Sequence, residues 1–201
     1  MNKKVVGLIL SITMLLCSCS FAGELFSDFS LDHWAAFYIY RAQDSGIING
    51  YPDGTFKPEN KVKTGEFIKL VVSCRWEPNL EKELPEGAHW VTPYAKLANN
   101  FLIYEPSYTY EMYETNITRA DAAVLIGKMY RILHPGIEID TTENFIKECP
   151  DESLITNEDT RYFINLCMQY GLINGFEDGT LRPNDTLTRA QAAKLIYLVR
   201  E

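Results

Sequence analysis

Hydrophobic residues recur along the chain at helical spacing and are separated by short polar loops rich in glycine. Trp34, Tyr38 and Ala42 follow one another at four-residue steps, which predicts that they share one face of a helix. Comparable stripes recur further along, at Ala122, Ile126, Met129 and Leu133 and at Ala192, Leu195, Ile196 and Val199. The pattern predicts a mainly α fold of short helices, with an irregular loop or a strand-like fragment between them.

Residues at the ends of these stripes indicate where helices begin and end. Asp32 is suited to cap the first helix, and Gly46 follows its last turn, where glycine often stands just past a C-cap. Thr188 and Gln191 have the spacing of a capping box at the start of the last helix.

The chain repeats itself. Residues 46–58 match residues 171–183 at a constant offset of 125, and residues 117–123 match residues 187–193. The dipeptide His33-Trp34 recurs as His89-Trp90. These matches divide the chain into three units, at 24–78, 79–138 and 139–201. One helix–loop–helix unit cannot bury both of its stripes, so we expect the three to pack as a pseudo-threefold trimer.

The N-terminus has the pattern of an export signal, predicted over residues 1–22. Lys3 and Lys4 precede an apolar run, Val5 to Leu16, that is too short to span a bilayer comfortably. Two processing routes stay open. Small residues near Ala22 suit simple cleavage, whereas Leu16-Cys17-Ser18-Cys19 resembles a lipoprotein box, in which Cys19 would carry a lipid. The protein is therefore expected to be exported, with membrane association only through lipidation at Cys19.

Composition and charge narrow the function. Hydrophobic residues make up 46% and charged residues 23%, a globular composition, and the net charge of −8 argues against nucleic acid as a partner. Cys74, Cys149 and Cys167 follow the leader without a Cys-x-x-Cys pair, which predicts apolar packing, no metal site and no cofactor. His33, His89 and His134 do not cluster with partners for acid–base or nucleophilic catalysis, so no enzyme is predicted.

The combined motifs resemble those of the S-layer homology domain. The motifs are Phe26-Ser27-Asp28, Trp34-Ala35, the glycine loop 46–58 with its counterpart 171–183, and Leu187-Thr188-Arg189-Ala190-Gln191. The resemblance implies a three-pronged, mainly helical fold of three repeats. It also implies non-covalent binding to an anionic secondary cell-wall polysaccharide, often pyruvylated, in grooves between adjacent repeats.

The resemblance also implies which residues bind the glycan. The candidates are Arg119, Arg189, Trp34, Trp90, Gly46, Gly50, Asp53, Gly171, Gly175, Asp178 and Lys63. Independently of the family, an arginine in the first turn of a capped helix lies where the helix dipole favours anions, and its planar fork suits a carboxylate. Glycine lets a sugar approach the backbone, and a tryptophan face can stack on sugar C–H groups.

Simpler interpretations of these residues stay open. Trp34 and Trp90 are also suited to packing between helices, and Asp53 and Asp178 to stabilising turns. Arg119 and Arg189 could pair with carboxylates of a neighbouring unit.

Each unit departs from the pattern. In the first unit, Thr64 stands where the third has Arg189, with Lys63 one position earlier. The second unit lacks the glycine loop, and in its place tyrosines crowd a segment around Tyr110. In the third, Asp159 occupies the tryptophan position. We therefore carry two functions forward: a non-catalytic glycan-binding protein of the cell wall or cell surface, and a protein–protein adaptor of the envelope whose glycan sites have degraded.

Overall fold

The computed structural model describes residues 26–76, 80, 84, 86–103, 110–138, 140 and 144–201. The predicted signal segment, with Cys19, lies outside the described residues. The elements are α1 (Ala36–Asp44), α2 (Thr64–Ser73), α3 (Thr92–Asn100), α4 (Tyr110–Tyr113), α5 (Arg119–Leu133), η2 (Phe145–Glu148), η3 (Glu152–Leu154), α6 (Glu158–Gln169) and α7 (Arg189–Leu198). The mainly α class is confirmed. None of the helices in the described part of the chain is long and apolar enough to cross a membrane.

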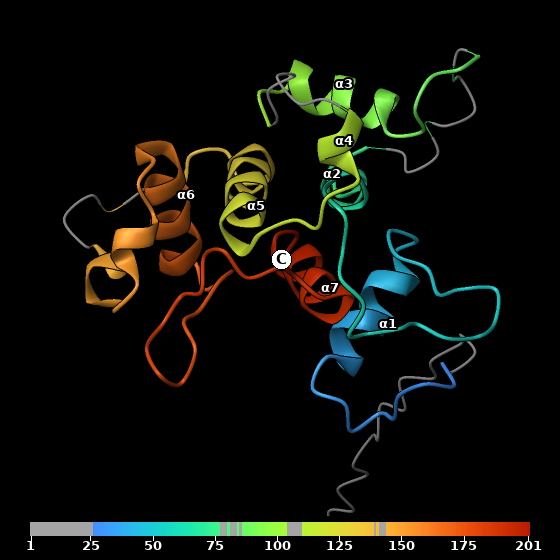
Figure 1. Ribbon diagram of the computed structural model, residues 1–201, viewed down its shortest axis with the longest axis horizontal. Coiled ribbons are helices and arrows are strands. Elements are labelled where there is room, and N and C mark those ends of the chain that lie inside the picture. The colour runs from blue at the N-terminus through green and yellow to red at the C-terminus, as the bar shows by residue number, and fades with distance from the viewer. Residues whose placement is uncertain are drawn as a thin grey trace, which may run out of the picture.

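The helices form an inner and an outer set. The inner helices α2, α5 and α7 gather around the centre, and α1, α3 and α6 lie outside them (Figure 1). Each outer helix packs on an inner helix of a different unit: α1 on α7, α3 on α2, and α6 on α5. Each unit therefore packs its outer helix on the inner helix of a neighbouring unit, and the three contacts close a ring.

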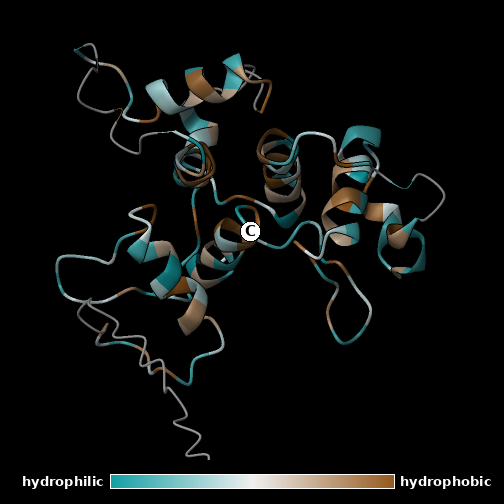
Figure 2. Cartoon of the chain, turned by 180° about the vertical axis from the view of Figure 1, so that it is seen from behind, coloured by the Kyte–Doolittle hydropathy of each residue, from teal (hydrophilic) through white to brown (hydrophobic). Residues whose placement is uncertain are grey.

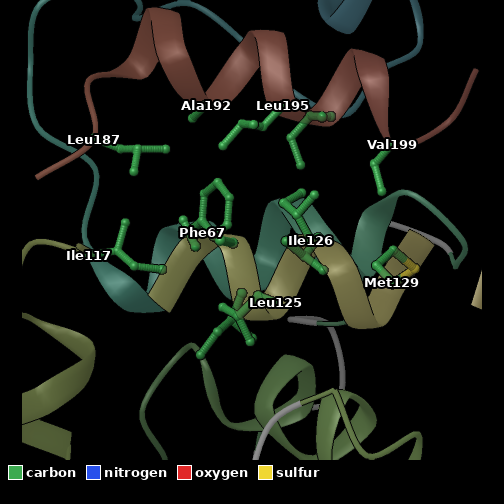
Figure 3. Close-up of a cluster of buried hydrophobic side chains, with 14 of the residues drawn as sticks. Phe67, Ile117, Leu125, Ile126, Met129, Leu187, Ala192, Leu195 and Val199 are labelled. Atoms are coloured by element: carbon green, nitrogen blue, oxygen red, sulfur yellow. The ribbon is translucent and has the colours of Figure 1, made fainter. Parts of the chain in front are cut away.

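Apolar side chains from the three inner helices meet in one core. Phe67 of α2 and Ile126 of α5 face Leu195 of α7, with Met129 and Val199 further along the same interface (Figure 3). Phe67, Ile126, Met129 and Val199 are fully buried. Burying a side chain of this size contributes about 1.5–3 kcal/mol. Hydrophobic residues gather on the inner helices, while the outward loops are mostly hydrophilic (Figure 2).

A closed triangle of backbone hydrogen bonds joins the units at the start of the inner helices. The Val62 amide donates to the Leu187 carbonyl (3.1 Å), Leu187 to Ile117 (3.1 Å), and Ile117 to Val62 (3.0 Å). All three side chains are buried. Each unit thus supplies one donor and one acceptor. The three bonds fix the positions of the segments that precede the inner helices relative to one another, in a pseudo-threefold arrangement.

The predicted start of the first helix is wrong. Asp32 does not cap α1; the helix begins at Ala36, and the His33 Nδ1 accepts a hydrogen bond from the Ala35 amide (3.1 Å). The buried face carries Ala35 and Ile39, whereas Trp34 is 53% exposed. A four-residue spacing shows that residues share one face of a helix, but it does not show whether that face is buried. An aromatic residue such as Trp34 can lie on the exposed face.

Two other helix ends agree with the sequence. Thr188 and Gln191 form the predicted capping box at α7, with the Thr188 hydroxyl accepting from the Gln191 amide and the Gln191 side chain accepting from the Thr188 amide. Gly46 has a φ of +71° directly after the C-cap of α1, a conformation that glycine adopts without strain. Of the two alternatives for the loop after Gly46, a strand-like fragment or an irregular loop, the structure shows the irregular loop over residues 46–58.

Candidate functional site

Arg189, in the first turn of α7, reaches across to the glycine loop of the first unit. Its Nε donates to the Phe56 carbonyl and its Nη2 to the Asn49 carbonyl, both at 2.8 Å. Its guanidinium carbon lies 4.8 Å from the centre of the Tyr51 ring. The arginine thus holds two points of the neighbouring loop and covers an aromatic face between them.

Arg119, in the first turn of α5, makes the equivalent contacts with the loop of the third unit. Its Nε donates to Leu181 (2.9 Å) and its Nη2 to Asn174 (3.3 Å). The Phe176 ring lies 4.7 Å from the Arg119 guanidinium carbon and 4.0 Å from that of Arg182. Neither motif arginine uses a neighbouring carboxylate for this role; each clamps backbone carbonyls of the adjacent unit.

A second device shapes the same loops. Both carboxylate oxygens of Asp28 accept backbone amides, from Phe56 (2.8 Å) and Lys57 (2.6 Å). These bonds hold Lys57 at a φ of +56°. That backbone conformation is unfavourable for a residue with a side chain, and the two hydrogen bonds offset its cost.

Asp151 performs the same task in the third unit, and sequence reasoning missed it. It accepts from Leu181 (2.9 Å) and Arg182 (2.7 Å), and Arg182 has a φ of +51°. Asp151 stands 123 residues after Asp28, so the constant repeat offset of 125 does not align the two aspartates. Aspartate followed about thirty residues later by the loop's Thr-Phe/Leu-Lys/Arg sequence is the signal that could have found it.

The loop aspartates are engaged in local hydrogen bonds. Asp53 accepts from the Thr55 hydroxyl (2.5 Å) and amide (3.0 Å) and pairs with Lys57 (3.2 Å). The bond from the Thr55 hydroxyl is the main reason that the pKa of Asp53 falls to about 2. Asp178 is bonded in the same way to Thr180 and Arg182, and its pKa is likewise well below the usual range. Both carboxylates stabilise turns in this structure.

A groove at Arg119 brings together residues from all three units. It has a volume of about 170 Å³, and we call it the Arg119 groove. Its lining includes Trp34 from the first unit, Arg119 from the second, and Gly175, Phe176 and Lys194 from the third. Trp34 is thus the tryptophan that shares a groove with Arg119.

A second hollow, of about 470 Å³, adjoins this groove and shares Arg119 with it. Lys61 and Arg182 also line it, together with Asp185. Burial lowers the pKa of the Arg119 guanidinium from its ordinary value, but an arginine stays charged in proteins. Arg182 is paired with Asp178 at 2.8 Å, which leaves Lys61 and Arg119 against the Asp185 carboxylate. This surface therefore has a local positive charge, although the whole chain carries −8.

Other predicted residues lie elsewhere. Trp90 is partly buried and packs at the edge of the core, its ring 6.5 Å from that of Tyr94. Lys63 forms an ion pair with Glu114, which raises the Lys63 pKa, and Glu114 also lies 3.2 Å from the His89 Nε2. The Lys63 ammonium is therefore engaged by a carboxylate of the second unit.

The loop glycines have distinct structural reasons. Gly171, like Gly46, has a positive φ, of +68°, after the end of its helix. A Cβ at Gly50 would lie 2.2 Å from the Phe26 ring, so this glycine is required for packing. At Gly175 the nearest atom would be 3.3 Å away, and this glycine lines the Arg119 groove.

The cysteines are free thiols. Cys74, Cys149 and Cys167 are all buried, and burial raises the pKa of Cys74 and of Cys167 to about 12. Their predicted role as apolar packing residues is confirmed. Over the described ranges, no group of three or more His, Cys, Asp or Glu side chains is placed to hold a metal ion.

Two segments of the chain match a known domain family. The fold and its grooves define a mainly α protein in which helix–loop–helix units interlock. The S-layer homology domain matches residues 25–68 and 160–193. The resemblance to this family is confirmed: the chain carries S-layer homology sequence in both segments, and residues 69–159 lie between them.

Three relatives show how far the similarity extends. The chain is 24% identical to the S-layer protein EA1 of Bacillus anthracis over 98% of its own length and 23% of that protein. It is 28% identical to the cellulosome-anchoring protein of Acetivibrio thermocellus over 51% of its length and 25% of the relative. It is 36% identical to the outer membrane protein alpha of Thermotoga maritima over 40% of its length and 20% of the relative. The chain thus spans about a quarter or less of these relatives.

Proposed function

We propose that this protein is a non-catalytic component of the cell surface that binds an anionic cell-wall polysaccharide through the Arg119 groove. The observation that carries the proposal is the convergence of Trp34, Arg119 and Gly175 from three different units. These are the residue types that the S-layer homology resemblance assigns to glycan binding. S-layer proteins and a cellulosome-anchoring protein among the relatives support a location at the cell surface.

The chemistry of the groove suits a sugar that carries a carboxylate. Trp34 offers an exposed ring for the apolar face of a sugar. Arg119 and Lys194 supply positive charge without a carboxylate among the lining residues, and the cationic hollow beside Arg119 extends this charge. A pyruvate ketal has the size and charge that such a site would hold. Because Arg119 Nε and Nη2 are committed to loop carbonyls, the arginine also fixes the loop against which the sugar would lie.

Retention on purified cell-wall sacculi tests the proposal. Trp34→Ala combined with Lys194→Glu removes the ring and reverses one charge while leaving the Arg119 clamp in place. We expect at least about tenfold weaker retention, because a charge-assisted contact is worth about 1.5–3 kcal/mol. Lys147→Glu, on the exposed surface of η2, makes the same charge change away from the groove and serves as the control.

Sacculi stripped of their secondary polysaccharide complete the design. The proposal predicts that stripping abolishes retention of the unmodified protein. Equal retention on native and stripped sacculi, or unchanged retention of the double variant, would disprove it.

An envelope-protein partner is the second candidate, supported by exposed apolar residues in the diverged second unit. Leu102 is 78% exposed, Tyr110 58% and Phe101 45%. Phe101 also packs on Trp76, with ring centres 4.3 Å apart. Exposed apolar groups of this kind are typical of protein contact surfaces. A photocrosslinking residue at position 102 should capture a protein in intact cells, and a residue at 147 should not; capture of wall glycan alone would argue against the adaptor.

A further inference from the structure

The pseudo-threefold arrangement creates another inter-unit groove, whose lining differs from that of the Arg119 groove. It has a volume of about 630 Å³, and we call it the Thr64 groove. The repeat offsets place Thr64 where the other groove has Arg119, and Asp159 where it has Trp34. Asp121 likewise stands at the position of Gln191. The position of the groove is retained, while every residue type that the family uses for an anionic glycan is replaced.

The replacement of arginine is coupled to the missing loop. In the other two unit interfaces, the arginine clamps the carbonyls of the neighbouring glycine loop. The first unit faces the second, which has no such loop, and there Thr64 bonds to the Thr115 carbonyl through both its amide (2.8 Å) and its hydroxyl (3.2 Å). A short side chain closes this interface without a long cation, which leaves room in the groove.

The charge of the Thr64 groove disfavours an anion. Asp121 and Asp159 contribute two carboxylates against one ammonium, from Lys128. The Thr118 hydroxyl donates to Asp121 (2.7 Å) and orients that carboxylate. An anionic sugar would meet net repulsion here, whereas the Arg119 groove attracts it.

The remaining lining suits hydroxyl and amide groups. Asn116, Asn157 and Thr160 add neutral polar side chains, and Met112, 39% exposed, offers an apolar contact for sugar C–H groups. Ligand sites commonly measure on the order of 300–1,000 Å³ and combine an apolar surface with a few polar groups. The Thr64 groove meets both conditions.

We propose that the Thr64 groove binds an uncharged saccharide, so that one chain recognises a neutral and an anionic glycan in separate grooves. The inference extends the proposed function to a second site. It does not depend on the Arg119 groove being occupied, since the two grooves share no charged residue.

Titration of the isotope-labelled full chain with the uncharged tetramer of N-acetylglucosamine tests this inference by NMR. We expect saturable shifts in the amides of Thr118, Asp121 and Thr160, and about tenfold weaker binding in Asp121→Ala/Asp159→Ala. Val124→Trp, which fills the groove from α5, is a second variant with the same expected loss. The control is Lys147→Trp, because residue 147 is exposed on η2 and is among the lining residues of neither groove.

Two comparison probes give outcomes that contradict the inference. The de-N-acetylated tetramer is cationic, and pyruvylated N-acetylmannosamine is anionic. Tighter binding of either probe at the Thr64 groove would overturn the assignment to a neutral sugar. The absence of shifts there when the unmodified protein meets the uncharged tetramer would also overturn it, as would undiminished binding by variants that keep their thermal midpoint. Shifts that the anionic probe causes only at the Arg119 groove test the proposed function alone. Anionic binding at the Arg119 groove and neutral binding at the Thr64 groove can therefore be disproved independently.

Discussion

The Nε of Arg189 donates a 2.8 Å hydrogen bond to the carbonyl of Phe56, across a sequence separation of 133 residues. The equivalent bond from Arg119 reaches Leu181 in the third unit. The first unit, which has Thr64 in place of this arginine, faces the second unit, which lacks the glycine loop. The motif arginine is therefore a clamp between units as well as a candidate ligand for the glycan.

Replacing the clamp with lysine should destabilise the fold. Arg189→Lys keeps the charge but cannot donate to Phe56 and Asn49 from one planar group. We expect a loss of about 1–3 kcal/mol in the free energy of unfolding. Urea unfolding measures it, with Arg131→Lys on the exposed surface of α5 as control. An unchanged midpoint for Arg189→Lys would show that the two carbonyl contacts contribute nothing.

Two equivalent loop glycines should respond unequally to alanine. A Cβ at Gly50 would lie 2.2 Å from the Phe26 ring and 2.9 Å from the Thr55 carbonyl, whereas at Gly175 the nearest atom is 3.3 Å away. Gly50→Ala should cost about 2 kcal/mol or more through forced displacement of the ring, and Gly175→Ala should stay within about 1 kcal/mol. Thermal unfolding of the two variants compares them directly; equal costs would contradict the role of Phe26.

Asp53 and Asp178 should contribute to stability in mild acid. The folded pKa of Asp53 is about 2, against an ordinary value of 3.8, and the Asp178 pKa is also lowered. Their contribution is therefore present above about pH 4 and is lost as the pH falls through the folded values. Asp53→Asn/Asp178→Asn should show a smaller fall in urea midpoint between pH 5 and pH 2 than the unmodified protein. Parallel pH profiles would refute the prediction.

The buried thiols should resist alkylation until the protein unfolds. At pH 8, a thiol with a pKa of about 12 has about a thousandfold less thiolate than one at the ordinary value of 9. Peptide mass spectrometry after brief iodoacetamide treatment should find Cys74 and Cys167 unmodified in native protein and fully modified in urea. Rapid native modification of either would show that its helix opens readily.

Local sequence signals predicted much of the fold. The capping box at Thr188 and the glycine after α1 depend on contacts within a few residues, so their spacing is visible in the sequence. The first helix start was wrong because the His33 ring, rather than Asp32, accepts the early amide.

The candidate site was only partly predictable. Arg119 and Trp34 were identified by their motifs, but their shared groove depends on which units meet, and a ring of three units leaves that choice open. Asp151 was missed because two residues fewer separate it from its counterpart than the repeat offset requires.

The sequence by itself indicated the internal repeats, most of the helices and the resemblance to S-layer homology domains, because periodicity, caps and glycine turns are local. The tertiary structure decided which inner helix each outer helix covers and which loop each arginine clamps. It also separated a cationic groove at Arg119 from an acidic one at Thr64. The physical reason is that the polar groups of each groove come from different units, and only packing around the common core brings them within contact distance.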